Sequence, residues 1–220
     1  MLLSLFTPTH EPKWLPETYN SLLRQSYQDW QWVIVPNGTC GPIAEHIRAD
    51  PRVKLVQGGE RLTNIGALKR LACDKCDGSA FIEMDHDDLL MPGETLQVIA
   101  NKIAGGAGFV FSDVAVFHDP GYTSHIYGLP YGWESYPFKY YGRRLQASRC
   151  FEITPRSLSE IFYCPDHVRV WGRKAYYDAN GHDKNLSVCD DHDLMCKTYL
   201  AGHRFEHTGG CHYLYRMHQT

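Results

Sequence analysis

The sequence predicts an α/β fold in which helices flank a doubly wound, mostly parallel central sheet. Short apolar segments of strand length alternate with amphipathic segments of helix length through the first half of the chain. Three of the apolar segments end in polar or turn-forming residues, which read T-P-T-H-E, P-N-G-T and D-H-D-D. In sheets of this kind, ligands bind beyond the carboxyl ends of the strands, so these three stretches are candidate binding residues.

The elements follow from apolar spacing and from the residues that end each segment. The first strand is an apolar run that ends at Thr-Pro-Thr, and the second ends at Pro-Asn-Gly. The first helix carries Leu15, Tyr19 and Leu22 on one side, and Gly202 ends the last helix. The expected strands are residues 2–6, 32–35, 53–56, 81–84, 108–111 and a short one at 213–216. The expected helices are residues 16–25, 43–49, 64–76, 93–103 and 190–201.

Residues 119–149 interrupt this alternation. They are rich in Tyr, Gly and Pro and lack a clear period, which predicts a long loop with short strands. Lys139, Arg143, Arg144 and Arg149 lie among aromatic residues there. This mixture is compatible with binding of a polyanion or nucleic acid, with stacking on a sugar, or with a lid whose charges are solvated.

Composition limits the class of protein. With 220 residues, 43% of them hydrophobic, the chain suits one domain with one sizeable core. Its net charge of −3 gives no global basic field for nucleic acid. No apolar run reaches the roughly 20 residues that span a bilayer, and the N-terminus lacks the pattern of a signal peptide, so we expect a cytoplasmic protein.

The eight cysteines do not require disulfides in a chain of this length. Cys73 and Cys76 form the only C-x-x-C pair, which is weak evidence for a zinc or redox site without a second pair. They lie on a helical pattern that leads into a strand, so we expect buried structural thiols. Trp171, in C-P-D-H-V-R-V-W, is expected to pack in the core; the alternative is that it helps to shape a binding site.

An acidic cluster follows the apolar strand at residues 81–84. Asp85 and Asp87 are two residues apart, so they point to the same side of an extended segment, and Asp88 follows them. Carboxylate oxygens suit Mg²⁺ or Mn²⁺, which also take oxygens from substrate phosphates. The alternative is a solvated turn whose aspartates only cap the following helix.

Four stretches, in order, resemble family-2 glycosyltransferases of the GT-A fold. They are L-F-T-P-T-H-E, N-I-G-A-L-K-R-L-A-C with G-S-A-F-I-E-M-D-H-D-D, V-C-D-D-H-D-L, and Y-L-Y-R-M-H. The resemblance covers nearly the whole chain. It implies a single GT-A domain over residues 1–220, with a half that binds the nucleotide sugar at 1–115 and an acceptor half at 116–220.

The implied reaction is metal-dependent transfer of a sugar from a nucleoside-diphosphate sugar to an acceptor hydroxyl, with inversion at the anomeric carbon. Lys69, with Arg70 beside it, is expected near the diphosphate because an ammonium suits phosphate as a point charge; the alternative is a solvated helix face. Asn37 replaces an aspartate usual in the family, so the base of the donor is left open. The residues implied in donor binding are Thr7, Pro8, Thr9, Glu11, Asn37, Asn64, Lys69 and Asp85.

The resemblance also implies the catalytic and metal residues. Asp191 is the expected general base, which takes the proton of the attacking hydroxyl, and Asp190 is its catalytic neighbour. The alternative is that both are ordinary acids in the first turn of a helix. Asp85, Asp87 and His218 are the expected metal ligands, although a histidine so near the end of the sequence is more often simply exposed.

Two other functions stay open from the sequence. A related fold carries out metal-dependent nucleotidyl transfer, but T-P-T-H-E-P-K offers little of the Gly-rich phosphate loop that this chemistry favours. A non-catalytic module that binds sugar or nucleotide is the other alternative. The sequence leaves the donor sugar, the oligomeric state and the acceptor open; a glycan, a lipid-linked sugar, a protein and a modified nucleobase all suit the implied reaction.

Overall fold

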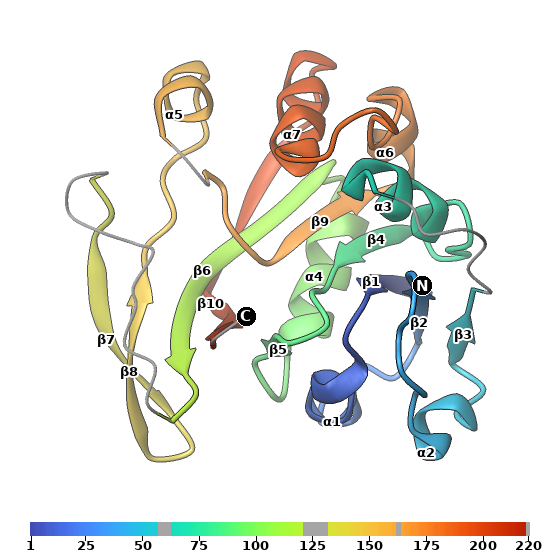
Figure 1. The fold of residues 1–220 in the computed structure, drawn as a ribbon. Coiled ribbons are helices and arrows are strands. Elements are labelled where there is room, and N and C mark those ends of the chain that lie inside the picture. Colours follow the sequence, from blue (N-terminus) through green and yellow to red (C-terminus); the bar gives the residue numbers. More distant parts are fainter. Residues whose placement is uncertain (57–62, 121–131, 162–163, 219–220) are drawn as a thin grey trace.

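The computed structural model describes residues 1–56, 63–120, 132–161 and 164–218. One ten-stranded sheet runs through the molecule, and its strands follow the order β3-β2-β1-β4-β9-β6-β10-β5, with β8 paired to β6 and β7 paired to β8 (Figure 1). The strands are β1 (Leu3–Thr9), β2 (Trp30–Pro36), β3 (Val53–Leu55), β4 (Ala80–Glu83), β5 (Leu89–Leu90), β6 (Phe109–His118), β7 (Ser135–Tyr140), β8 (Arg143–Ser148), β9 (Arg169–Gly172) and β10 (Phe205–Met217).

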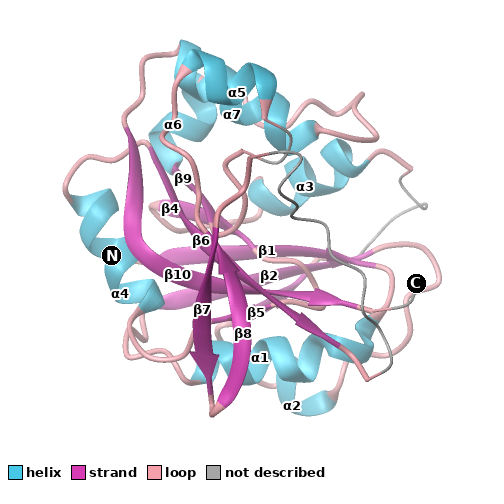
Figure 2. Ribbon diagram, turned by 90° about the vertical axis from the view of Figure 1, so that its left-hand side faces the viewer, coloured by secondary structure: helices cyan, strands magenta, loops and turns pink. Residues whose placement is uncertain are grey.

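Helices cover both faces of the sheet (Figure 2). One core contains apolar side chains of α1, α2 and α4, and a second core on the opposite face contains side chains of α3, α6 and α7. Alternation along β1 and β2 feeds both cores, since Leu5 and Trp32 face the first and Phe6 and Val33 face the second. The helices are α1 (Leu15–Leu23), α2 (Glu45–Arg48), α3 (Ile65–Cys73), α4 (Thr95–Ala104), α5 (Pro155–Glu160), α6 (Arg173–Asp178) and α7 (Asp190–Leu200), with a short 3₁₀ helix at Pro12–Trp14.

The predicted fold class is confirmed. The first half of the chain forms parallel pairs between β1, β2, β3 and β4, and β6 pairs in parallel with β10. The strand that joins these two parallel parts is β9, which runs antiparallel to β4 on one side and to β6 on the other. The expected division near residue 115 falls inside β6, so strands from both expected halves share one sheet.

Several element boundaries differ from the prediction. The final strand is 13 residues long, because β10 lies beside β6 over nearly the whole length of that ten-residue strand. The sequence pattern understated it because glycines interrupt its middle, where the register with β6 shifts. Within the expected long loop, β7 and β8 form a hairpin joined at Tyr141 and Gly142; residues 121–131 of that loop lie outside the described residues.

The cysteine and tryptophan predictions are confirmed. Cys73 and Cys76 are both buried as free thiols, and burial raises the pKa of each thiol. Trp171 is fully buried in the second core. Among the described residues, no helix is both long enough and apolar enough to cross a membrane.

Candidate active site

The carboxyl ends of β1, β2 and β4 lie side by side, as the parallel sheet requires. Thr9, the last residue of β1, is opposite Pro36 in β2, and the amide of Asn37 donates a hydrogen bond of 2.7 Å to the carbonyl of Thr9. The predicted nucleoside residues Pro8 and Asn37 are therefore neighbours at one edge of the sheet. This edge continues into the acidic turn, because Met84, just after β4, donates its amide to Phe6 of β1 at 3.2 Å.

Some of the predicted donor residues hold this edge together. The buried hydroxyl of Thr7 donates to the carbonyl of Met84 at 2.6 Å and accepts from the indole of Trp32 at 2.8 Å. Thr9 is buried as well, and its hydroxyl donates to the carbonyl of Glu11 at 3.0 Å. The Glu11 carboxylate accepts from a backbone amide and caps the 3₁₀ helix. These three side chains shape the loop at the carboxyl end of β1.

Asn64 contacts a different segment of the chain. It occupies the position before α3, and its amide nitrogen donates to the carbonyl of Lys184 at 3.1 Å. The residues directly before it, 57–62, lie outside the described residues. Its side chain therefore ties α3 to the segment that precedes α7.

The acidic turn presents two of its three carboxylates. Asp85 and Asp87 are partly exposed, whereas Asp88 is buried and accepts a hydrogen bond of 2.7 Å from the amide of Arg216. The imidazole Nε2 of His218 is 2.8 Å from Oδ2 of Asp87, so the acidic turn and the last motif of the sequence, Y-L-Y-R-M-H, lie next to each other. Desolvation and the neighbouring carboxylates raise the pKa of Asp85 and of Asp88.

These residues fit a divalent cation of the kind that uses substrate oxygens. Asp85, Asp87 and His218 offer oxygen and imidazole donors, and a cation relieves the repulsion between the carboxylates. Within the described ranges, no three His, Cys, Asp or Glu side chains are already arranged around one metal position. A bound ion here would therefore need further ligands, such as the oxygens of a substrate phosphate.

Arg216 fastens the acidic turn to the rest of the molecule. Its guanidinium Nε donates to the carbonyl of Asp87 at 2.7 Å, and its other nitrogens reach Asp119 at 3.0 Å and Glu17 at 2.7 Å. The guanidinium carbon also lies 4.0 Å from the centre of the Trp14 ring. One buried arginine of β10 thus fixes the turn between β10 and α1.

The structure places Lys69 inside the protein. It lies on the apolar face of α3, with its side chain 8% exposed, and its ammonium is 2.7 Å from Oε1 of Glu83 and 3.3 Å from Oδ2 of Asp190. The charge of Lys69 is therefore balanced by two buried carboxylates. Lys69 is neither on a solvated helix face nor an unpaired cation that is free to bind phosphate. Arg70 points elsewhere, toward Asp74 and the carbonyl of Asn180.

The two predicted catalytic acids point in different directions. Asp190 is buried, and its carboxylate contacts Lys69 and lies 3.0 Å from Nδ1 of His182, which is itself fully buried. Asp191 is more exposed, at 19% of its side chain, and forms an ion pair with Arg169. Asp190 thus anchors the start of α7 in the core, and Asp191 is the acid that remains accessible.

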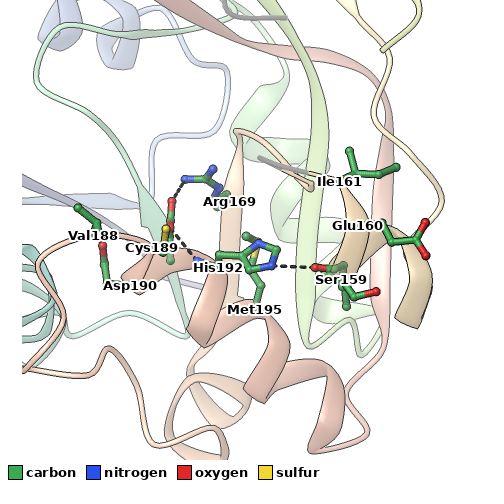
Figure 3. Close-up of a pocket in the computed structure, with 11 residues that line it drawn as sticks. Ser159, Glu160, Ile161, Arg169, Val188, Cys189, Asp190, His192 and Met195 are labelled. Atoms are coloured by element: carbon green, nitrogen blue, oxygen red, sulfur yellow. Dashed lines mark hydrogen bonds and ion pairs between the residues drawn. The ribbon is translucent and has the colours of Figure 1, made fainter. Parts of the chain in front are cut away.

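Asp191 lines a cavity of about 570 Å³ between α5 and the start of α7 (Figure 3). Most of the wall is apolar, with Leu158, Ile161, Val188 and Met195, and Figure 3 places Arg169 on one side of this cavity and Glu160 on the other. The ring of His192 is 2.8 Å from the carbonyl of Leu158, which joins α7 to α5. The cavity is thus largely apolar, and two residues of its wall present accessible carboxylates: Glu160, which pairs with Arg156, and Asp191.

The electrostatics of this carboxylate favour its ionised form. Burial alone raises the pKa of Asp191, but the charges of Arg169 and then Lys69 outweigh burial, so its pKa lies below the usual range of an aspartate. The backbone amide of His192 adds a hydrogen bond of 2.7 Å. Asp191 is therefore a carboxylate at any pH near neutrality.

The acidic turn and Asp191 are linked through two residues next to each other in space. Nε2 of His167 is 3.4 Å from Oδ2 of Asp85 and 3.4 Å from Nη1 of Arg169, and that same Nη1 contacts Asp191. Burial, followed by the charge of Arg169, lowers the pKa of His167 to about 4, so its ring is neutral. The two groups of acids thus lie on one side of the sheet, with two side chains between them.

Sequence reasoning did not find Glu83, Arg169 or His182. The first two leave a detectable signal, because each is a charged residue in an otherwise apolar strand segment, F-I-E-M and V-R-V-W. A charge at such a position requires a buried partner, and here the two are opposite each other on β4 and β9. His182 has no comparable signal in the sequence.

In the hairpin, Lys139 and Arg144 lie on the face opposite to Tyr136, Phe138 and Tyr140, whereas Arg143 is opposite Tyr140. Tyr136, Phe138 and Tyr140 pack against a small core on β6 and β10, whereas Lys139 and Arg144 are exposed and directly opposite each other. The aromatic rings are therefore partly buried in packing. Among the described residues, no acidic side chain is paired with Lys139 or Arg144.

Comparisons with known proteins agree with this fold. The family model described as Glycosyl transferase family 2 matches residues 4–162, which is more than half of the chain. The chain therefore belongs to glycosyl transferase family 2. Asp190, Asp191 and His218 lie beyond the matched range, so their roles rest on geometry and on the motifs. No curated protein sequence matches the chain.

Solved structures with the same fold include those of TarS from S. aureus. The crystal structure of TarS 1-349 in complex with UDP-GlcNAc is 18% identical, with a TM-score of 0.73, and the match covers 100% of this chain and 60% of that one. The complex of the same protein with UDP gives 18% identity and a TM-score of 0.71, over 99% and 61% of the two chains. The chain thus spans about three fifths of the length of these structures, which show that its fold is that of GT-A glycosyltransferases.

Proposed function

We propose that this chain transfers a sugar from a nucleoside-diphosphate sugar to an acceptor hydroxyl, in one displacement that inverts the anomeric carbon. The observation that carries the proposal is the placement of Asp191. It is an accessible, ionised carboxylate in the wall of a cavity, and His167 and Arg169 connect it to the acidic turn at the ends of the parallel strands.

The donor site of this proposal is the edge formed by the ends of β1, β2 and β4. Pro8, Asn37 and the loop held by Thr7, Thr9 and Glu11 border the nucleoside, and Asp85 and Asp87 lie beside the diphosphate. TarS, with the same fold, has been solved with UDP-GlcNAc, which supports a nucleotide sugar as donor. Residues 1–115 then supply most of the donor site, and residues 116–220 supply most of the acceptor site.

Asp85, Asp87 and His218 are the residues that would hold a divalent metal. When bound, Mn²⁺ or Mg²⁺ neutralises the negative charge of the departing diphosphate. Desolvation, followed by repulsion from neighbouring carboxylates, raises the pKa of Asp85 and Asp88, and a bound cation would stabilise their ionised forms. In this proposal Lys69 does not bind the diphosphate. Its ammonium instead pairs with Glu83 and Asp190.

The acceptor binds in the cavity between α5 and α7, with its hydroxyl at Asp191. The carboxylate accepts the hydroxyl proton as the oxygen attacks the anomeric carbon, and a single base suffices for inversion. Asp190 does not reach the acceptor in this proposal, because its carboxylate is occupied by Lys69 and His182. Its role is to fix the first turn of α7.

A donor screen tests the proposal. The full chain is incubated with a panel of nucleoside-diphosphate sugars and Mn²⁺, and the released nucleotide is identified by chromatography. We expect slow hydrolysis of one donor, with release of a nucleoside diphosphate. Release of pyrophosphate would instead indicate nucleotidyl transfer, and binding without turnover of any donor or acceptor would indicate a binding module.

A further inference from the structure

Arg169 occupies the first position of β9, the antiparallel strand that joins the two parallel parts of the sheet. It is opposite Glu83 of β4 and Phe111 of β6. Side chains opposite each other in a sheet lie on the same face, so the Arg169 guanidinium extends past the end of β4 toward α7. No other described arginine lies in a central strand between β4 and β6.

The guanidinium is almost fully buried, at 4% of its side chain, and acids surround it. It pairs with Asp191, lies 3.5 Å from Asp166 and 3.7 Å from Glu83, and its Nε donates to the carbonyl of Pro165 at 3.3 Å. A planar guanidinium with this many fixed acceptors has little freedom to rotate. It is a rigid point against which another side chain can be aligned.

Both oxygens of Asp191 are held. Oδ2 accepts from Nη1 of Arg169, and Oδ1 accepts from the amide of His192 at 2.7 Å. Two separate contacts fix the plane of the carboxylate, and the lone pairs that they leave free are available to the cavity. The carboxylate is thus oriented from two sides, by a guanidinium of β9 and by a backbone amide of its own helix.

The same guanidinium is connected to the donor side. Nη1 of Arg169 lies 3.4 Å from Nε2 of His167, whose ring stacks on Tyr213 with 4.4 Å between ring centres, and Nε2 lies 3.4 Å from Asp85. A single segment of the chain therefore contacts a donor-side acid and the acceptor-side base. Its backbone sets how far apart these two groups lie.

We propose that Arg169 is a positioning residue, which orients the carboxylate of Asp191 and, with His167, sets its separation from Asp85. The inference rests on the proposed function of Asp191 as the base. It adds a residue that lies in the wall of the cavity and acts on the reaction through the carboxylate of Asp191. Misplacement of a reacting group by about 1 Å can cost roughly 100-fold in rate, so loss of Arg169 is expected to act mainly on turnover.

The test compares Arg169→Met and Arg169→Lys in the full chain. We expect Arg169→Met to lower kcat by about 100-fold, while the dissociation constant of the donor changes by less than about threefold. Arg169→Lys keeps the charge but loses the fork of donors, so it should recover only part of kcat. Arg173→Met is the matched control, because Arg173 follows on the same segment, donates to the carbonyls of Cys76 and Gly78, and lies over the rings of Phe81 and Tyr177.

A pH profile separates positioning from general damage to the fold. The charged side chains around Asp191 are Arg169, Lys69 and the acids Asp190, Glu83 and Asp166, with neutral His167 nearby. Removal of the Arg169 charge raises the pKa of Asp191, so the acidic limb of kcat should move to higher pH in Arg169→Met. The limb should stay near its original position in Arg169→Lys and in Arg173→Met.

Each outcome decides a different question. If the unmodified chain transfers no sugar, the proposed function fails. If the unmodified chain is active and Arg169→Met keeps its kcat and its acidic limb, the positioning role fails. If Arg169→Met does not fold, Arg169→Lys decides: a kcat equal to that of the unmodified chain would overturn the role of the guanidinium fork, and a reduced kcat with unchanged donor binding would support it.

Discussion

Lys69 and Glu83 form a buried ion pair, with 2.7 Å between Nζ and Oε1, directly behind the acidic turn. Lys69 also reaches Asp190, so a single ammonium joins the strand that leads into the turn to the helix that carries Asp191. The ion pairs of Lys69 thus fix the end of β4, which leads into the acidic turn, relative to the start of α7, which carries Asp191. They also make the protein's stability depend on one lysine of α3.

Replacement of this lysine should destabilise the fold more than it weakens nucleotide binding. Lys69→Met removes the cation that the buried carboxylates of Glu83 and Asp190 share, which we expect to cost about 3–5 kcal/mol in the free energy of unfolding. Urea denaturation measures this cost. Arg70→Met is the control on the same helix; its contact with Asp74 is near the surface, and we expect a loss below about 1 kcal/mol. A stable Lys69→Met protein that had lost nucleotide affinity would contradict this role.

Turnover should depend on a divalent cation that the acidic turn binds. EDTA should abolish transfer, and Mn²⁺ should restore it. Asp87→Asn removes one charge beside His218, so we expect the Mn²⁺ concentration for half-maximal activity to rise about tenfold. Asp74→Asn is the control, since Asp74 lies at the far end of α3 and pairs with Arg70. Full turnover in EDTA after exhaustive dialysis would exclude this part of the account.

The base of the donor should respond to Asn37. An amide both donates and accepts hydrogen bonds, whereas a carboxylate only accepts, so Asn37→Asp should favour bases that present an N–H group. We expect the ratio of affinities for UDP and for the other nucleoside diphosphates to change by about tenfold in Asn37→Asp. Isothermal titration with four nucleoside diphosphates gives this ratio. An unchanged ranking would mean that Asn37 does not contact the base.

Acid stability should depend on Asp50. Its carboxylate binds Arg52 at 2.8 Å and the hydroxyl of Tyr19 at 2.7 Å, and these bonds, that to Arg52 first, lower its pKa to about 2 from 3.8. A lowered folded-state pKa stabilises the fold fully above pH 3.8, and this contribution is lost as the pH falls toward 2.

The unmodified chain should therefore lose about 1–2 kcal/mol more than Asp50→Asn between pH 5 and pH 2. Urea unfolding at several pH values measures the difference. Asp29→Asn, at an exposed acid, should show the same pH dependence as the unmodified chain. Parallel curves for the unmodified chain and Asp50→Asn would rule out this linkage.

Much of the fold could be predicted because local pattern and tertiary structure agree. The strands of the first half are apolar runs that end in turn residues, and the structure has them at nearly the predicted positions. Strand β9 was missed because it has only four residues and begins with Arg169. The length of β10 was missed because its pairing with β6 extends through Gly209 and Gly210, which local propensity does not favour in a strand.

The candidate site was predictable where motifs place residues at strand ends. Asp87 and His218 meet although 131 positions separate them in the sequence. The environment of Lys69 was not predicted, although it shares a stripe with Leu68, Ala72 and Cys73 and so occupies an apolar position of α3. Spacing along a helix gives the face on which a lysine lies, but its partners, Glu83 and Asp190, come from distant segments.

The most direct test of the account concerns Asp191, and Asp193→Asn is its matched control. Asp193 lies in the same turn of α7 and pairs with Lys197 at 2.6 Å, away from Arg169. Transfer rate and donor affinity are measured on the same preparations. The account predicts that Asp191→Asn lowers turnover by at least about 100-fold with unchanged donor affinity, as expected for a lost general base, while Asp193→Asn stays active. Turnover in Asp191→Asn equal to that of the unmodified chain would contradict it.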